Sequence, residues 1–225
     1  MKKFLFLVFL AAGLCAGAVS PRAGVSILGD SYSTFEGHML PDTNLVWYYA
    51  VPDLKHTDVT DVKQTWWQQL IRQKGWRLEV NNSYSGSTIC NRGYDGKDYT
   101  DRSFLTRAKD LGSPDVILIF GGTNDSWAGV KAGTYETPKG KKPDYYTLRP
   151  ALDRMLREMK DYYPGTDIYF IVNTGLRPEV TESIVTLCER HGVKVIRLSD
   201  IDKMAGHPSV KGMTSIAEQV GAAID

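Results

Sequence analysis

The sequence predicts an α/β fold built around a parallel β-sheet. Short apolar segments rich in β-branched residues alternate with amphipathic stretches, which is typical of repeated βαβ units. The central apolar segments are almost continuously hydrophobic, as expected for strands that helices cover on both faces. Five strands are predicted, at residues 25–28, 77–80, 116–120, 168–172 and 194–198.

Apolar residues at helical spacing predict the helices that cover this sheet. The first spans residues 65–74 and ends at Gly75, a usual position for a left-handed cap. Two more are indicated by apolar sets, namely Leu152, Met155, Leu156, Met159 and Tyr163, and then Met213, Ile216, Ala217, Val220 and Ile224. Cys188 lies on the apolar face of another helix, which favours a buried thiol over a disulfide with Cys90.

Residues 1–18 are predicted to be a secretory signal peptide. Lys2 and Lys3 precede the apolar run 4–14, and the small residues 16–18 place the cleavage site before Val19. The apolar run is shorter than the ~20 residues that a membrane-spanning helix needs. We therefore expect a secreted or periplasmic protein whose residues 19–225 form a single domain.

Chain length, net charge and the positions of His and Cys limit the number of domains and the kinds of partner and cofactor to expect. Removing 18 of the 225 residues leaves 207, which suffice for one α/β domain and are few for two. The same cut removes two lysines and moves the formal net charge from +1 to −1, so nothing favours a nucleic-acid partner. The four histidines lie far apart and no CxxC pattern occurs, so we expect neither a metal site nor an organic cofactor.

Polar clusters follow four of the predicted strands. Gly29-Asp30-Ser31 follows the first strand, residues 81–88 the second, residues 121–125 the third and Gly206-His207-Pro208 the fifth. Ligands bind at the carboxyl edge of an open parallel sheet, where the strand order reverses. With the order 2-1-3-4-5, the first three clusters become neighbours. The connections 35–64 and 126–145 are unusually long, which favours functional or mobile loops.

These clusters contain the groups that acyl transfer requires. A serine hydroxyl becomes a nucleophile when a nearby base takes its proton, and a neutral imidazole suits that task. Ser31 is the candidate nucleophile and His207 the candidate base. The oxyanion of the tetrahedral intermediate needs hydrogen-bond donors, which the Ser31 N–H, the Gly86 N–H and the Asn124 amide would supply.

The four clusters resemble the sequence blocks of the SGNH (GDSL-like) hydrolase family, from Gly29 to Gly212. The resemblance implies a flavodoxin-like three-layer α/β/α sandwich and a serine esterase. Ser31, Gly86, Asn124 and His207 would take the four roles that name the family. One position departs from the pattern, because Met204 stands where the family has its aspartate. Asp202 is predicted to orient His207 instead, with Asp200 or a backbone carbonyl as alternatives.

The substrate is predicted from export and from aromatic residues near the site. We expect short acyl esters, chiefly O-acetyl groups on carbohydrate, with Trp127, Asp30 and Trp47 in contact with substrate. Three alternatives stay open: a lysophospholipase or lipase-type esterase, an acyltransferase, and a catalytically silent carbohydrate-binding protein on the same scaffold.

Overall fold

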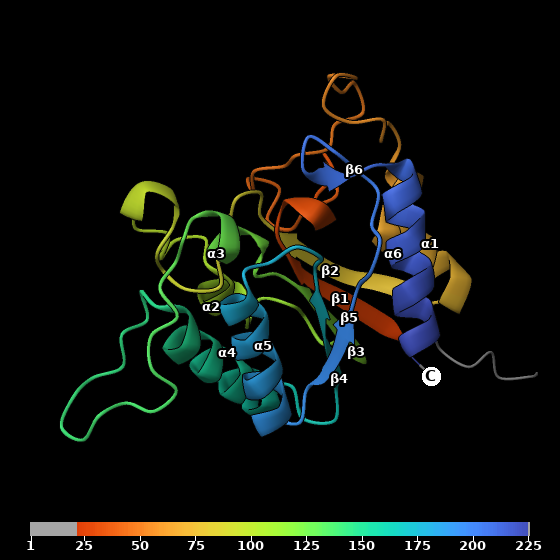
Figure 1. Cartoon of the computed structure of the whole chain (residues 1–225). Coiled ribbons are helices and arrows are strands. Elements are labelled where there is room, and N and C mark those ends of the chain that lie inside the picture. Colours follow the sequence, from red (N-terminus) through yellow and green to blue (C-terminus); the bar gives the residue numbers. More distant parts are fainter. Residues whose placement is uncertain (1–21, 225) are drawn as a thin grey trace, which may run out of the picture.

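A five-stranded parallel sheet forms the centre of the molecule (Figure 1). The structure is a computed structural model that describes residues 22–224. Its strands are β1 (Gly24–Gly29), β2 (Arg77–Ser83), β3 (Val116–Phe120), β4 (Asp167–Val172) and β5 (Lys194–Arg197), in the order β2-β1-β3-β4-β5. The predicted fold class and strand order are therefore confirmed, whereas the predicted signal peptide lies outside the described residues.

Helices cover both faces of the sheet. They are α1 (Trp66–Lys74) and α6 (Val210–Ala223) on one face, and α2 (Phe104–Arg107), α4 (Leu148–Tyr162) and α5 (Pro178–Arg190) on the other (Figure 1). Successive side chains of a strand point to opposite faces. In β3, Ile117 and Ile119 belong to the core under α4 and α5, whereas Leu118 and Phe120 belong to the core under α1 and α6. Both faces are buried, which explains the continuous apolar runs.

The helix ends follow the expected chemistry. α1 begins after Thr65 and ends at Gly75, which has a left-handed backbone with φ of 66°. Ser209 caps α6, because its hydroxyl accepts a hydrogen bond from the N–H of Gly212. The predicted helices are found at both places. Cys90 and Cys188 are buried free thiols.

Strand β2 extends three residues beyond its predicted end at Val80. Asn81, Asn82 and Ser83 continue the pairing with β1 although they are polar and buried. Their side chains are satisfied locally, since the Asn81 amide donates to the Ser33 carbonyl and the Ser83 hydroxyl donates to Asn81 Oδ1. Buried polar groups with such partners can lie within a strand.

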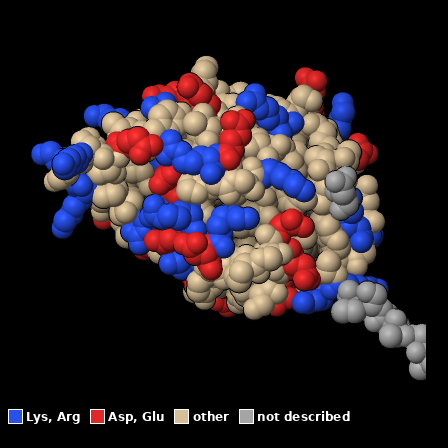
Figure 2. Space-filling model, turned by 90° about the horizontal axis from the view of Figure 1, so that it is seen from below, with Lys and Arg blue, Asp and Glu red and all other residues tan. Residues whose placement is uncertain are grey.

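Short elements carry the loops at the carboxyl edge of the sheet. They are the 3-10 helices η1 (Ser31–Ser33), η2 (Val62–Gln64) and η3 (Tyr94–Gly96), the helix α3 (Thr123–Trp127), and the hairpin of β6 (Lys203–Met204) with β7 (His207–Pro208). Between residues 22 and 224, no helix is both long and apolar enough to cross a membrane. Acidic and basic side chains are interspersed over the face shown in Figure 2.

Candidate active site

Ser31 and His207 meet at the carboxyl edge of the sheet. Ser31 is the first residue of η1, separated by one residue from the end of β1, and His207 is the first residue of β7. His207 Nε2 lies 2.9 Å from Ser31 Oγ, although 176 residues separate the two in the chain. Both are nearly buried, with relative exposures of 2% for Ser31 and 6% for His207. This contact is the geometry in which an imidazole can take a proton from a serine hydroxyl.

A backbone carbonyl orients the imidazole. His207 Nδ1 lies 3.1 Å from the Ala205 carbonyl oxygen, so this contact fixes the proton on Nδ1 and leaves Nε2 free to accept from Ser31. The β6–β7 hairpin produces the contact, because its turn residues Ala205 and Gly206 both have positive φ, of 46° and 79°. Such a two-residue turn matches the twist of a hairpin.

The prediction that Asp202 orients His207 is wrong. The Asp202 carboxylate accepts a hydrogen bond from the hydroxyl of Ser209, at the start of α6, whereas the ring nitrogens of His207 contact the Ala205 carbonyl and Ser31 Oγ. Asp200 lies on the exposed approach to the hairpin, and no ion pair joins His207 to a carboxylate within residues 22–224. The carbonyl alternative from the sequence is the arrangement that the fold adopts.

Aromatic side chains enclose His207. The indole of Trp47 stacks on the imidazole with ring centroids 3.6 Å apart and an interplanar angle of 9°. Trp127, Tyr32 and Tyr48 approach from other directions, with centroids 5.8, 5.3 and 6.5 Å away. Burial lowers the pKa of His207 from its ordinary value to about 4. The imidazole is therefore neutral near pH 7, as a general base must be.

The Gly86 loop and Asn124 contact each other at the carboxyl edge of the sheet. Gly86 has φ of 82°, and nothing would contact a Cβ there, so its place in the loop is set by the backbone conformation. The Asn124 side chain donates to the Ser87 carbonyl at 3.0 Å, which leaves its second N–H for another acceptor. Tyr94 donates to Asn124 Oδ1 at 2.7 Å and holds the amide in this orientation. No sequence motif pointed to this tyrosine.

A buried arginine joins the strand ends behind the site. The Arg107 guanidinium donates to the carbonyls of Gly29 and Asn82 and to the hydroxyl of Ser87. It therefore links the ends of β1 and β2 to the loop that carries Gly86. Burial lowers the pKa of Arg107 to about 9, so the side chain is still charged at pH 7. Its place in the sequence, within a four-residue helix, predicted no such contact.

The three residues predicted to contact substrate lie in three different environments. Asp30 is fully buried and accepts a hydrogen bond from the Tyr32 N–H, so it shapes the η1 turn, and its contact with substrate stays a prediction. Burial raises the pKa of Asp30 to about 7. Trp127 is 47% exposed, its ring lies at 72° to the His207 imidazole, and its contact with substrate stays a prediction. Trp47 stacks on the base itself.

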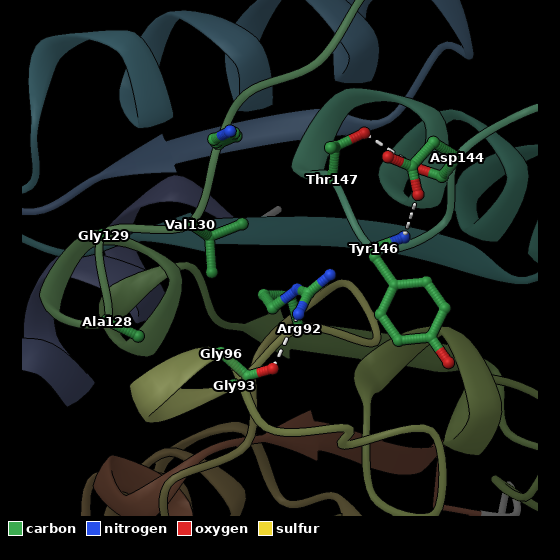
Figure 3. A pocket seen from close by; sticks show the side chains of 10 residues that line it. Arg92, Gly93, Gly96, Ala128, Gly129, Val130, Asp144, Tyr146 and Thr147 are labelled. Carbon is green, nitrogen blue, oxygen red and sulfur yellow. Dashed lines mark hydrogen bonds between the residues drawn. The ribbon is translucent and has the colours of Figure 1, made fainter.

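A pocket of about 450 Å³ lies beside the η3 turn, and residues of the segments 128–131 and 144–147 complete its lining (Figure 3). Gly93 and Gly96 line it and flank Tyr94, whose hydroxyl contacts Asn124. Its polar lining includes Arg92, Asp144 and Tyr146. The Arg92 guanidinium lies 5.1 Å from the ring centroid of Tyr146. In residues 22–224, no group of three or more His, Cys, Asp or Glu is placed to hold a metal ion.

The fold and the contact between Ser31 and His207 are consistent with a hydrolase, and comparison with known proteins assigns the family. Residues 23–224 match the family model for GDSL-like lipase/acylhydrolase. A solved GDSL-like lipase from Bacteroides ovatus is 53% identical, with a TM-score of 0.86 over 90% of this chain and 97% of that chain. A second one, from Bacteroides uniformis, is also 53% identical, with a TM-score of 0.86 over 90% and 95%. The chain belongs to the GDSL-like lipase/acylhydrolase family, which confirms the resemblance to SGNH hydrolases.

More distant structures share the fold. An acetyl xylan esterase from the rumen bacterium Butyrivibrio proteoclasticus is 15% identical, with a TM-score of 0.56 over 90% of this chain and 63% of that chain. A further carbohydrate esterase is 17% identical, with a TM-score of 0.61 over 92% and 69%. No protein with a curated description matches this chain.

Proposed function

We propose that this hydrolase is an exported serine esterase that removes short acyl groups, chiefly acetyl, from carbohydrate. The observation that carries the esterase chemistry is the 2.9 Å contact between His207 Nε2 and Ser31 Oγ. The neutral imidazole takes the hydroxyl proton as Ser31 Oγ attacks the ester carbonyl carbon. The carbonyl electron pair moves to the oxygen, which the N–H groups of Ser31 and Gly86 and the free N–H of Asn124 stabilise.

The intermediate then collapses to an acyl-enzyme on Ser31. The bond between the acyl carbon and the alcohol oxygen breaks, and His207 returns its proton to that oxygen. Water attacks the acyl carbon in the second half-reaction, with His207 again as base, and the acid leaves as Ser31 regains its proton. No step in this sequence calls for a metal or an organic cofactor.

The polar pocket supports a carbohydrate as the alcohol part of the substrate. Arg92, Asp144 and Thr147 place hydrogen-bonding groups around a volume of about 450 Å³ next to Tyr94. Hydroxyl-rich ligands need such partners, because each buried hydroxyl must keep a hydrogen bond. Two of the fold neighbours are themselves named as carbohydrate esterases, and the basic and apolar start of the sequence supports export.

A lipid ester is the second candidate, and one surface feature favours it. The long connection after β1 exposes five apolar side chains on one loop, namely Leu40, Leu45, Tyr49, Val51 and Leu54. Val51 is 91% exposed and Leu54 is 68% exposed. Exposed apolar groups gathered on one segment are typical of contact with lipid or with another protein.

Hydrolysis of a series of p-nitrophenyl esters and of acetylated xylan tests the proposal. We expect kcat/KM to be highest for the acetyl ester and to fall by at least about tenfold at octanoyl, with acetate released from the xylan. Ser31→Ala should abolish both activities, and Ser113→Ala, at an exposed remote site, should retain them. A preference for octanoyl or longer chains that Val51→Asp and Leu54→Asp reduce would favour the lipid candidate instead.

A further inference from the structure

Two groups, neither of them a carboxylate, contact the imidazole of His207 where a catalytic triad would have an aspartate as partner. The Ala205 carbonyl contacts Nδ1, and the indole of Trp47 covers one face of the imidazole ring at 3.6 Å. A carbonyl fixes the tautomer of a histidine but carries no net charge. The imidazolium that forms when His207 takes a proton therefore lacks a carboxylate partner.

The surroundings make that cation costly. His207 is 6% exposed, and the ammonium of Lys203, on the same hairpin, opposes a second positive charge. Lys203 Nζ is held by Asn173 and Thr174, and it lies 5.6 Å from the ring centroid of Tyr32. Burial raises the pKa values of Tyr32 and Tyr48, so both stay neutral. The π-face of Trp47 is the electron-rich surface in direct contact with the ring.

The loop that carries Trp47 is attached to the catalytic residues on both sides. The Trp47 N–H donates to Thr34 Oγ1 at 2.9 Å, and the Thr34 hydroxyl donates to the carbonyl of Ser31 at 2.9 Å. The next residue, Tyr48, donates its hydroxyl to the Pro208 carbonyl at 2.9 Å, directly after the base. These bonds fix the indole relative to both Ser31 and His207.

We propose that Trp47 is a positioning residue that holds the His207 ring plane and stabilises the imidazolium through its π-face, in place of a triad carboxylate. This inference rests on the proposed ester hydrolysis. In the first step the Ser31 proton moves to Nε2 while Oγ bonds to the acyl carbon. In the next step that proton moves to the leaving alcohol. The charge on His207 exists only between these events, so the indole stabilises the transition states more than the resting enzyme.

Two substitutions of similar size separate this role from simple covering of the histidine. Trp47→Phe keeps a π-face, whereas Trp47→Leu keeps an apolar side chain without one. We expect Trp47→Leu to lower kcat about 30-fold, which is about 2 kcal/mol at 1.36 kcal/mol per tenfold. Trp47→Phe should lose clearly less, with KM within about twofold of wild type in both variants. Tyr162→Leu, an exposed aromatic on α4, is the matched control and should be unchanged.

Two kinetic results would overturn the proposal. Equal kcat in the Phe and Leu variants would mean that Trp47 only excludes water. A rise in KM with unchanged kcat would mean that Trp47 binds substrate, as the sequence suggested. Far-UV circular dichroism confirms that each variant is folded before its kinetics are compared.

The pKa of His207 gives a readout that needs no substrate. NMR titration of ¹³C-labelled histidine, assigned with His207→Ala, follows this ring in the free enzyme. The pKa should be lower in Trp47→Leu than in Trp47→Phe, because the latter still stabilises the cation. Identical values would contradict the inference. A wild-type enzyme that cleaves no ester, with this order of pKa values intact, would refute the proposed function and still support the contact between Trp47 and His207.

Discussion

Ala205 has an unusual backbone conformation that its residue type does not predict. It is a non-glycine residue with φ of 46°, a conformation that costs roughly 1–2 kcal/mol for an L-residue. This conformation turns its carbonyl toward His207 Nδ1. Local strain of this kind persists where the surrounding structure holds it. The hydrogen bonds of Tyr32 to the Gly206 carbonyl and of Tyr48 to the Pro208 carbonyl hold the hairpin in place here.

Asp202→Asn tests whether a carboxylate takes part in catalysis. We expect kcat to stay within about threefold of wild type, because the side-chain oxygen of the introduced asparagine can still accept from Ser209 and no bond to His207 is lost. In serine proteases with a Ser-His-Asp triad, replacing the aspartate by asparagine lowers kcat by about 10⁴-fold. Steady-state kinetics with an acetyl ester distinguish the two, and a loss beyond a hundredfold would restore Asp202 to the site.

Residues in the polar clusters after the strands were the predictable part of the site. Ser31, Gly86, Asn124 and His207 stand in polar clusters at strand ends, and the structure brings these clusters to one edge of the sheet. The sequence could not show which backbone carbonyl orients His207, because every residue has one. Only the left-handed conformation of Ala205 in the folded hairpin turns its carbonyl toward the imidazole. Tyr94 and Arg107 also showed no sequence signal, since their contacts depend on tertiary structure.

The β6–β7 hairpin depends on close packing against the start of α6. Gly212 lies in the first turn of that helix, and a Cβ there would fall on the carbonyl oxygen of Asp202 and crowd Ile201. The same carbonyl accepts the N–H of Ser209. The segment that leads into the hairpin is therefore held against the helix by backbone contact, which only a glycine permits.

Gly212→Ala is expected to destabilise the protein by about 1–3 kcal/mol, the usual cost of overpacking. The clash involves backbone atoms, so it cannot be relieved by a change of rotamer. Urea denaturation followed by circular dichroism measures the free energy of unfolding, with Lys211→Ala as a neighbouring exposed control. Stability equal to wild type would show that the hairpin and helix are farther apart than the structure places them.

Among the helices and strands, the sequence predicted those in which the apolar pattern extends over many residues. The central strands are almost continuously apolar because both of their faces are buried. The helices α1, α4 and α6 have apolar residues at helical spacing because one face of each packs on the sheet. The extension of β2 was missed because Asn81, Asn82 and Ser83 favour turns by composition, and tertiary hydrogen bonds override that preference. The elements η3 and α2 are too short to produce a pattern.

Over the whole molecule, the parallel sheet explains why distant segments share one site. The order β2-β1-β3-β4-β5 places β1 between β2 and β3, so the loops after these strands converge at one edge. The hairpin after β5 reaches the same edge through the contact between His207 and Ser31. The strand order belongs to the flavodoxin-like fold that the resemblance to SGNH hydrolases implied, and the structure confirms it. The stacking of Trp47 on His207 was not predicted, because it depends on the path of the long connection after β1.

Activation of Ser31 by His207 underlies all of the proposed chemistry, and labelling with a fluorophosphonate probes it without a natural substrate. Such probes form a covalent bond with an activated serine whatever ester the enzyme normally cleaves. Intact mass and peptide mapping should show one adduct, on Ser31, which is absent from Ser31→Ala and strongly reduced in His207→Ala. Ser113→Ala should label like wild type. An unlabelled wild-type protein, an adduct at another residue, or full-rate labelling of His207→Ala would contradict the proposed roles of the two residues.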